Sequence, residues 1–275
     1  MIEQGLGCYV YCVVRAGEHP SLEGLEAVDP VFGIEPLTHA DLSALTSRVR
    51  LEEFGAEALK RNLEDLGWVE RTARAHDAVL ARALTADAVV PLRLCTIFAD
   101  EAHVRDMLER EEESLLEALE RLRGHAEWSV KVLVKPRELE AAARARSPEP
   151  AATAAAEQGS PGRAFFERKK VDRGLREEAR SMADAAAEEV HMRLGQEAAA
   201  ATLLPPQHPE LSRRSGEMVL NGAYLVHRSR SEDFAAAAGD LRDRHSGIGI
   251  ELDISGPWAP YNFVTPPGEA RRDER

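Results

Sequence analysis

Cysteine and histidine are the side chains that most readily supply a nucleophile, a base or a metal ligand. Cys8 and Cys12 lie four residues apart, inside an apolar run that predicts a β-strand. On one face of a strand, two such residues lie about 13 Å apart. Zinc–sulfur bonds are only about 2.3 Å long, so one ion could not easily bind both thiolates. We therefore interpret both as core cysteines and predict no metal site.

A cysteine-dependent enzyme built around Cys95 and His76 is the catalytic alternative. His76 lies on the apolar stripe of a predicted helix and is followed by Asp77. Adjacent helical residues do not face each other, so Asp77 is poorly placed to orient the imidazole. No nucleophile motif surrounds Cys95 or its neighbour Thr96. We expect a half-buried histidine bonded to a backbone carbonyl, and the enzyme hypothesis requires Cys95 and His76 within hydrogen-bond reach.

The motifs that bind common cofactors do not occur in the sequence. There is no GxxxxGK[ST] phosphate loop, no GxGxxG after the first strand, no HExxH and no paired CxxC. The sequence therefore predicts no catalytic residue, no cofactor, no metal and no small-molecule substrate. A binding protein should instead present an apolar surface patch.

Charge and composition narrow the class of partner. The chain has 275 residues and a formal net charge of −13, which argues against nucleic acid and against anionic membranes as partners. No apolar run reaches the roughly 20 residues that span a bilayer, and the first residues carry no signal-peptide pattern. Three cysteines give no disulfide framework. We expect a cytoplasmic protein.

Hydrophobic periodicity predicts strands and helices in both halves of the chain. The first strand is apolar on both faces, with residues 9, 11 and 13 on one face and 8, 10, 12 and 14 on the other, which is typical of an inner strand. The expected strands are residues 8–14, 33–38, 42–49, 88–92, 126–134, 217–227 and 248–254. The expected helices are residues 59–84, 101–123, 173–195 and 231–244, with Gly124 as a helix cap.

These elements predict an α+β fold in two domains, because strands and helices alternate without a regular parallel repeat. We expect a domain over residues 1–140 and another, with a long Ala-rich helix, over 163–267. Each should be a small mixed or antiparallel sheet with packed helices, and a ferredoxin-like order is one option. Residues 141–162 are rich in Ala and Pro and are interpreted as a linker, and the charged residues 268–275 as a disordered tail.

Several segments, in order along the chain, resemble the gas vesicle protein F/L family. They are residues 9–14 (YVYCVV), 89–98 (VVPLRLCTIF), 127–132 (EWSVKV), 161–166 (PGRAFF), 218–226 (MVLNGAYLV) and 256–263 (GPWAPYNF). The last is the most distinctive. Leu94-Cys95 departs from the family, which usually has Phe-Gly there, and glycine takes positive φ more easily than cysteine does.

The resemblance implies an accessory protein of gas vesicle assembly, located in the cytoplasm and at the gas vesicle. Its implied partners are the hydrophobic gas vesicle shell protein and other gas vesicle accessory proteins. Shell subunits must bury large apolar faces, so free subunits would aggregate unless a partner masks those faces. A minor structural component of the vesicle shell is the alternative.

Five residues are candidates for partner contacts or for a structural corner: Arg93, Trp128, Pro257, Trp258 and Tyr261. The two prolines of the GPWAPYNF segment stiffen the backbone, and we expect Trp258 and Tyr261 to cap the core of the second domain. Arg93 is expected to bond buried carbonyls.

Overall fold

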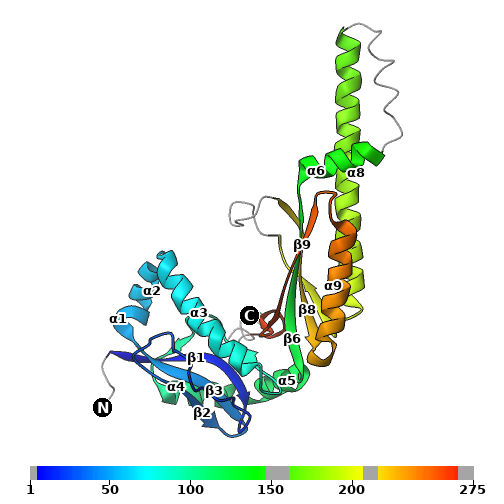
Figure 1. Cartoon of the computed structure of the whole chain (residues 1–275). Helices are drawn as coiled ribbons and strands as arrows, with labels where there is room; N and C mark the ends of the chain where they lie inside the picture. The colour runs from blue at the N-terminus through cyan, green and yellow to red at the C-terminus, as the bar shows by residue number, and fades with distance from the viewer. Residues whose placement is uncertain (1–4, 147–160, 207–215, 266–275) are drawn as a thin grey trace. The chain divides into compact units, whose positions relative to one another are not determined.

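The computed structural model describes residues 5–146, 161–206 and 216–265. Residue contacts divide the chain into two compact units, each with its own sheet (Figure 1). The first unit comprises Met1–Glu127 together with Pro257–Arg275, and the second comprises Trp128–Gly256. The predicted α+β class with two sheets is confirmed.

Among the described residues, the first unit contains a five-stranded sheet and helices of 4 to 18 residues. Its strands are β1 (Leu6–Arg15), β2 (Ile34–His39), β3 (Leu42–Arg50), β4 (Val90–Pro91) and β5 (Ile97–Phe98). Its helices are α1 (Leu51–Phe54), α2 (Ala56–Asn62), α3 (Leu66–Ala83), α4 (Glu101–Arg110), α5 (Glu112–Leu122) and the 3-10 turn η3 (Tyr261–Phe263). The sheet order is β2-β3-β1-β4, and β5 also pairs with β1.

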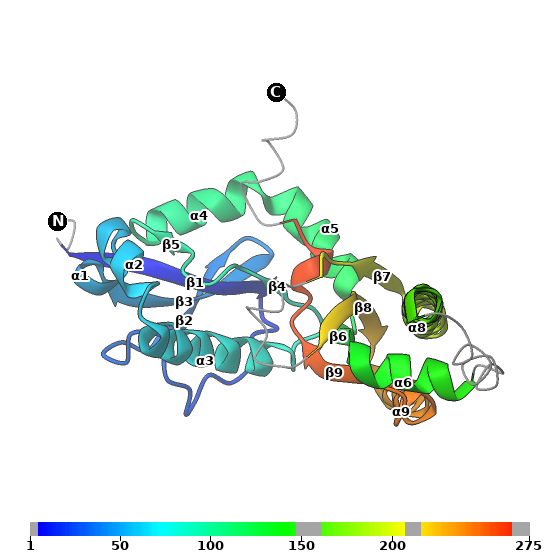
Figure 2. The same ribbon diagram turned by 90° about the horizontal axis from the view of Figure 1, so that it is seen from above.

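Strand β1 is the inner strand that its two apolar faces predict. It pairs antiparallel with β3 on one edge and with β4 and β5 on the other, while α3 and α4 cover opposite faces of the sheet (Figure 2). A bulge interrupts the register between Val10 and Cys12, so the expected alternation fails. Cys12 and Val14 pack in the same core cluster as Tyr9 and Tyr11, because the extra residue shifts the face on which later side chains lie.

Two of the predicted helices are each divided by a polar residue. The helix expected over 59–84 becomes α2 and α3, because the Asp65 carboxylate caps α3 by accepting from the Gly67 and Trp68 amides. The helix expected over 101–123 breaks at Glu111 into α4 and α5. Gly124 takes φ 71°, as predicted for a helix end.

The second unit has the element order of a ferredoxin-like domain. Its elements are β6 (His125–Val134), α6 (Pro136–Arg146), α8 (Pro161–Gly195), β7 (Ala200–Leu203), β8 (Glu217–His227), η2 (Arg228–Arg230), α9 (Ser231–His245) and β9 (Ile250–Trp258). Two strand–helix–strand crossovers, interrupted by the β7–β8 hairpin, give the sheet order β7-β8-β6-β9. Helices α8 and α9 lie on one face of this sheet (Figure 1).

The observed division of the chain differs from the predicted one. Strand β6, expected in the first domain, is a central strand of the second sheet, and Pro257 onward returns to the first unit. Periodicity identifies a strand but not its partner, so these non-local pairings could not be predicted. The predicted linker is partly helical at its ends, in α6 and α8. Its residues 147–160 and the predicted tail 268–275 lie outside the described residues.

Gly249 holds a tight approach between the end of α9 and the start of α6, and Gly249→Ala should lower the free energy of unfolding by about 1–3 kcal/mol. Its φ is +84°, and an added Cβ would lie 2.7 Å from the Glu138 Cβ. Gly239→Ala is the control, because nothing lies within 4 Å of its position in α9; it should stabilise by up to about 1 kcal/mol. Urea unfolding measures both, and equal effects would contradict the packing described.

Candidate functional site

A buried chain of hydrogen bonds crosses the first unit at His76. Its Nδ1 lies 2.9 Å from the Tyr9 hydroxyl, and its Nε2 lies 2.8 Å from the Tyr261 hydroxyl. The Tyr9 oxygen also accepts the Cys95 amide at 3.0 Å, and the Tyr11 ring stacks on the imidazole with centroids 5.6 Å apart. The imidazole is 2% exposed. The chain thus joins β1, α3, the β4–β5 turn and η3.

Burial keeps the side chains of this hydrogen-bond network uncharged at neutral pH. It lowers the pKa of His76 to about 4, opposed only partly by the Leu92 carbonyl. Burial also raises the pKa of the Tyr9 and Tyr261 hydroxyls well above their usual range. Neutral groups can share these hydrogen bonds without the cost of burying a charge. We interpret the chain as a structural network.

The cysteine-enzyme hypothesis finds no support in this geometry. Both ring nitrogens of His76 are bonded to tyrosine hydroxyls, and burial raises the pKa of the Cys95 thiol. A nucleophilic cysteine needs a lowered pKa and a base in contact. Cys95 contributes its backbone instead: it takes φ 64°, the left-handed region that glycine adopts more readily, and directs its amide to Tyr9.

The C-terminal segment 257–265 folds onto the first unit through polar contacts. The Glu127 carboxylate accepts from the Asn262 amide at 2.8 Å and from Asn262 Nδ2 at 2.6 Å. Arg121 donates to the Phe263 carbonyl at 2.9 Å. Ala259 is buried in the cluster that contains Tyr9 and Tyr11. We call residues 257–263 the C-terminal corner.

Trp258 does not cap a core, and that prediction is wrong. Its side chain is 47% exposed, and Pro257 is exposed as well. Ala259 and Pro260 are the buried residues of the corner, and Ala259 packs in the core of the first unit, not the second. Tyr261 is 36% exposed, and its hydroxyl forms the last hydrogen bond of the network around His76 in the first unit.

The remaining two candidates are not part of this corner. Arg93 is exposed in the β4–β5 turn, where its carbonyl accepts from the Thr96 amide and hydroxyl. Trp128 is half-buried in the second unit and packs on Phe234, with ring centroids 5.5 Å apart. Four of the five candidates therefore belong to the first unit, and the corner gathers three of them.

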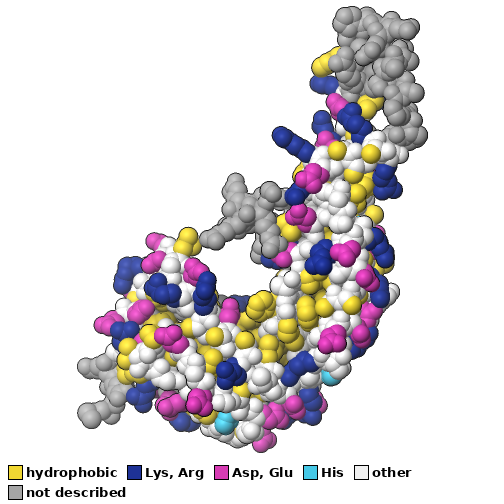
Figure 3. All heavy atoms as spheres, viewed as in Figure 1, with side chains coloured by type: hydrophobic (Ala, Val, Ile, Leu, Met, Phe, Trp, Pro, Cys, Tyr) yellow, Lys and Arg dark blue, Asp and Glu magenta, His cyan; other side chains and the backbone are white. Residues whose placement is uncertain are grey.

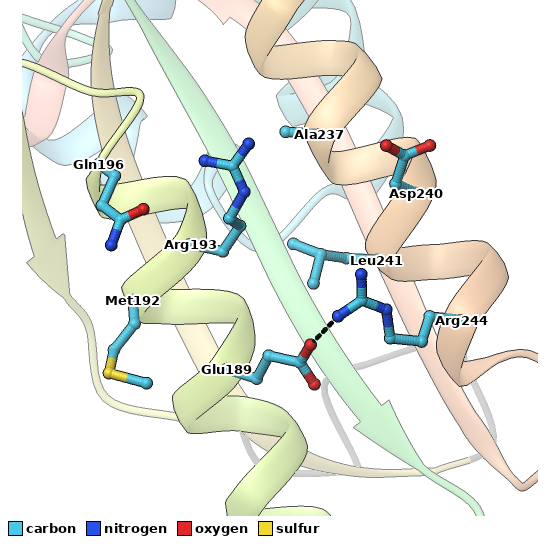
Figure 4. Close-up of a pocket in the computed structure, with 8 residues that line it drawn as sticks. All are labelled: Glu189, Met192, Arg193, Gln196, Ala237, Asp240, Leu241 and Arg244. Atoms are coloured by element: carbon cyan, nitrogen blue, oxygen red, sulfur yellow. Dashed lines mark hydrogen bonds and ion pairs between the residues drawn. The ribbon is translucent and has the colours of Figure 1, made fainter.

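Each unit also has a surface hollow that the sequence did not predict. In the second unit, a groove of about 220 Å³ lies between α8 and α9, and the Glu189–Arg244 ion pair lies across it (Figure 4). In the first unit, a hollow of about 700 Å³ is lined by the starts of β1 and α4 and by β3. Both are formed by elements distant in sequence, which local patterns cannot bring together.

The described residues contain no candidate metal-binding cluster. Within 5–146, 161–206 and 216–265, no group of three or more His, Cys, Asp or Glu side chains is arranged to bind an ion. None of the helices in these ranges combines the length and apolarity needed to cross a membrane.

A model of one protein family, described as gas vesicle synthesis protein GvpL/GvpF, matches residues 7–265. Gas vesicle protein L of Streptomyces sp. (strain CB03234) is 39% identical over 259 residues, which cover 93% of this chain and 92% of that protein. Gas vesicle protein F of the same strain is 30% identical over 261 residues, covering 94% of this chain and 100% of that protein.

Solved structures show the same fold. The crystal structure of GvpF from Anabaena sp. PCC7120 has a TM-score of 0.67 at 18% identity, covering 94% of this chain and 96% of that one. GvpF from Microcystis aeruginosa has a TM-score of 0.65 at 17% identity, covering 94% and 99%.

Trp258→Ala should lower the free energy of unfolding by less than about 1 kcal/mol, because the side chain is largely exposed. Trp68→Ala is the buried comparison. That indole is 5% exposed and donates to Glu53 at 2.8 Å, so its loss should cost about 3–5 kcal/mol. Chemical denaturation measures both. A loss above about 2 kcal/mol for Trp258→Ala would show that this side chain packs in a core.

Stability should fall as the pH drops from 7 to 5, because the folded chain binds a proton at His76 more weakly than the unfolded chain does. The pKa of His76 falls from 6.5 to about 4 on folding, so its contribution is complete above pH 6.5 and is lost toward pH 4. About 2 kcal/mol should disappear between pH 7 and 5. His76→Gln should be less stable but should lack this dependence. Equal pH dependence of the two chains in urea unfolding would contradict the assignment.

Proposed function

The chain belongs to the gas vesicle synthesis protein family GvpL/GvpF, and we propose that it is an accessory protein that binds the hydrophobic shell protein during assembly. The resemblance predicted from the sequence segments is confirmed. Membership of the family indicates the process, which is gas vesicle synthesis. The proposal about binding partners rests on the surface of this chain. Other accessory proteins of gas vesicles are further partners in the proposal.

The exposed Trp258 at the end of strand β9 supports the proposal most strongly, because the residues that follow it are held in place. Ala259 is buried before the turn, and hydrogen bonds of Tyr261 and Asn262 hold the end of the corner. A preorganised aromatic loses little conformational entropy when it is buried by a partner. Tryptophan is also the residue type that most often dominates interface energies. The corner therefore has the physical properties of a contact point for an apolar surface.

The net charge of −13 supports the same role. Shell subunits with large apolar faces associate unless those faces are covered. A strongly charged partner bound to them keeps the complex soluble and repels other complexes of the same kind. In this proposal the protein acts in the cytoplasm and at the growing vesicle, by binding rather than by catalysis. It uses no cofactor, no small-molecule substrate, no nucleic acid and no membrane.

Purified chain added to freshly diluted shell protein should slow the rise of light scattering, and Trp258→Ala should weaken that effect about tenfold in the concentration required. Leu66→Ala is the control, because Leu66 is also exposed in the first unit but lies outside the corner. The effect should persist near 1 M salt, where the Debye length is about 3 Å, because apolar burial supplies the affinity.

An equal rise of scattering with and without the chain would contradict binding to free shell subunits. Sedimentation of the chain with intact vesicles would then favour a structural component of the finished shell.

A further inference from the structure

The start of α8 presents an exposed face that is both aromatic and basic. At about 100° per residue, Phe165, Phe166, Lys169, Lys170 and Arg173 fall within an arc of about 140°. Leu175, which packs in the core of the second unit, lies on the other side of the helix, about 150° from the middle of this arc. All five residues of the arc are exposed. We call them the basic aromatic face.

Packing within the second unit does not account for the two phenylalanines. Phe165 is 54% exposed and Phe166 is 73% exposed. Their rings lie 6.0 Å apart, edge to face, and the Lys169 ammonium lies 5.0 Å from the Phe165 centroid. This end of α8 extends past α6 (Figure 1), and basic and hydrophobic side chains lie side by side along it (Figure 3). Contiguous exposed aromatics of this kind mark interaction surfaces.

The charge of this stretch is opposite to that of the whole chain. Residues 161–176 contain six basic and two acidic residues, whereas the chain carries a net charge of −13. Complementarity therefore favours an acidic partner. Two copies of the face would place cations against cations, which excludes symmetric pairing of the faces. An extended polyanion, such as a membrane or nucleic acid, would also meet the negative remainder of the chain.

We propose that the basic aromatic face is a docking site for a short acidic segment of a partner protein that carries apolar side chains. Acidic groups would pair with Lys169, Lys170 and Arg173, while the apolar side chains cover Phe165 and Phe166. Five side chains form less than a standard interface, so the contact is weak and transient. Its cations are exposed, so binding weakens with salt. The inference stands apart from the proposed shell contact, whose binding persists in salt.

The test uses the full chain and a labelled helical peptide with a leucine stripe and glutamate on its other positions. A second peptide carries lysine in place of glutamate. Fluorescence anisotropy should show binding of the acidic peptide and about tenfold weaker binding of the basic one. Lys169→Glu with Lys170→Glu should reverse that preference. Lys60→Glu with Arg61→Glu, which changes two exposed cations on α2, should leave the preference unchanged.

A second pair of variants tests whether the two phenylalanines contribute to binding. Phe165→Ser with Phe166→Ser should weaken binding of the acidic peptide about tenfold. Leu63→Ser with Leu66→Ser, which changes two other exposed apolar residues, should not weaken it. Equal affinity for the two peptides, or undiminished binding by the α8 variants, would overturn the proposal. Preferential binding of phosphatidylserine vesicles, or of a second copy of the chain, over the acidic peptide would also overturn the proposal.

Discussion

A histidine that must stay neutral organises the first unit. His76 is bonded through both ring nitrogens to tyrosine hydroxyls, in surroundings that penalise its charge. Tyr9 comes from the central strand and lies 67 positions before His76, and Tyr261 lies 185 positions after it, so one side chain joins segments far apart in the sequence. Because a buried polar group is costly without its partners, the C-terminal corner is required by the first unit's own core.

The C-terminal corner and the basic aromatic face differ in the interactions that would drive binding. Trp258 ends strand β9 and is followed by residues that are buried or hydrogen-bonded, which suits the burial of apolar surface at little entropic cost. Phe165 and Lys169 lie at the start of α8, before the residues of this helix that pack in the core. Their exposed ring and cation suit a weaker, charge-selective contact. The proposed contact with an apolar subunit would use the first kind of surface, and the proposed contact with an acidic segment would use the second.

Local elements could be predicted from the sequence because their signals are local. Strand β8 and helix α9 begin at the predicted residues, and β6 places Val130, Val132 and Val134 in one core as their alternation indicates. The bulge at Tyr11 left no signal, since both faces of β1 are apolar. The sequence motif identifies the corner but not its contacts, because Trp258 is exposed and Tyr261 bonds to His76 of the first unit. Its true partners, His76 and Glu127, are far away in sequence, and only the folded chain brings them together.

The C-terminal corner covers His76 through Tyr261 and helps to keep the imidazole neutral. An NMR titration of the His76 imidazole tests this most directly, with His76→Gln used to assign the resonance. We predict a pKa of about 4 in the unaltered chain and a shift toward the ordinary value of about 6.5 in Tyr261→Ala, where water reaches the ring. A pKa near 6.5 in the unaltered chain, or one that stays near 4 in Tyr261→Ala, would contradict it.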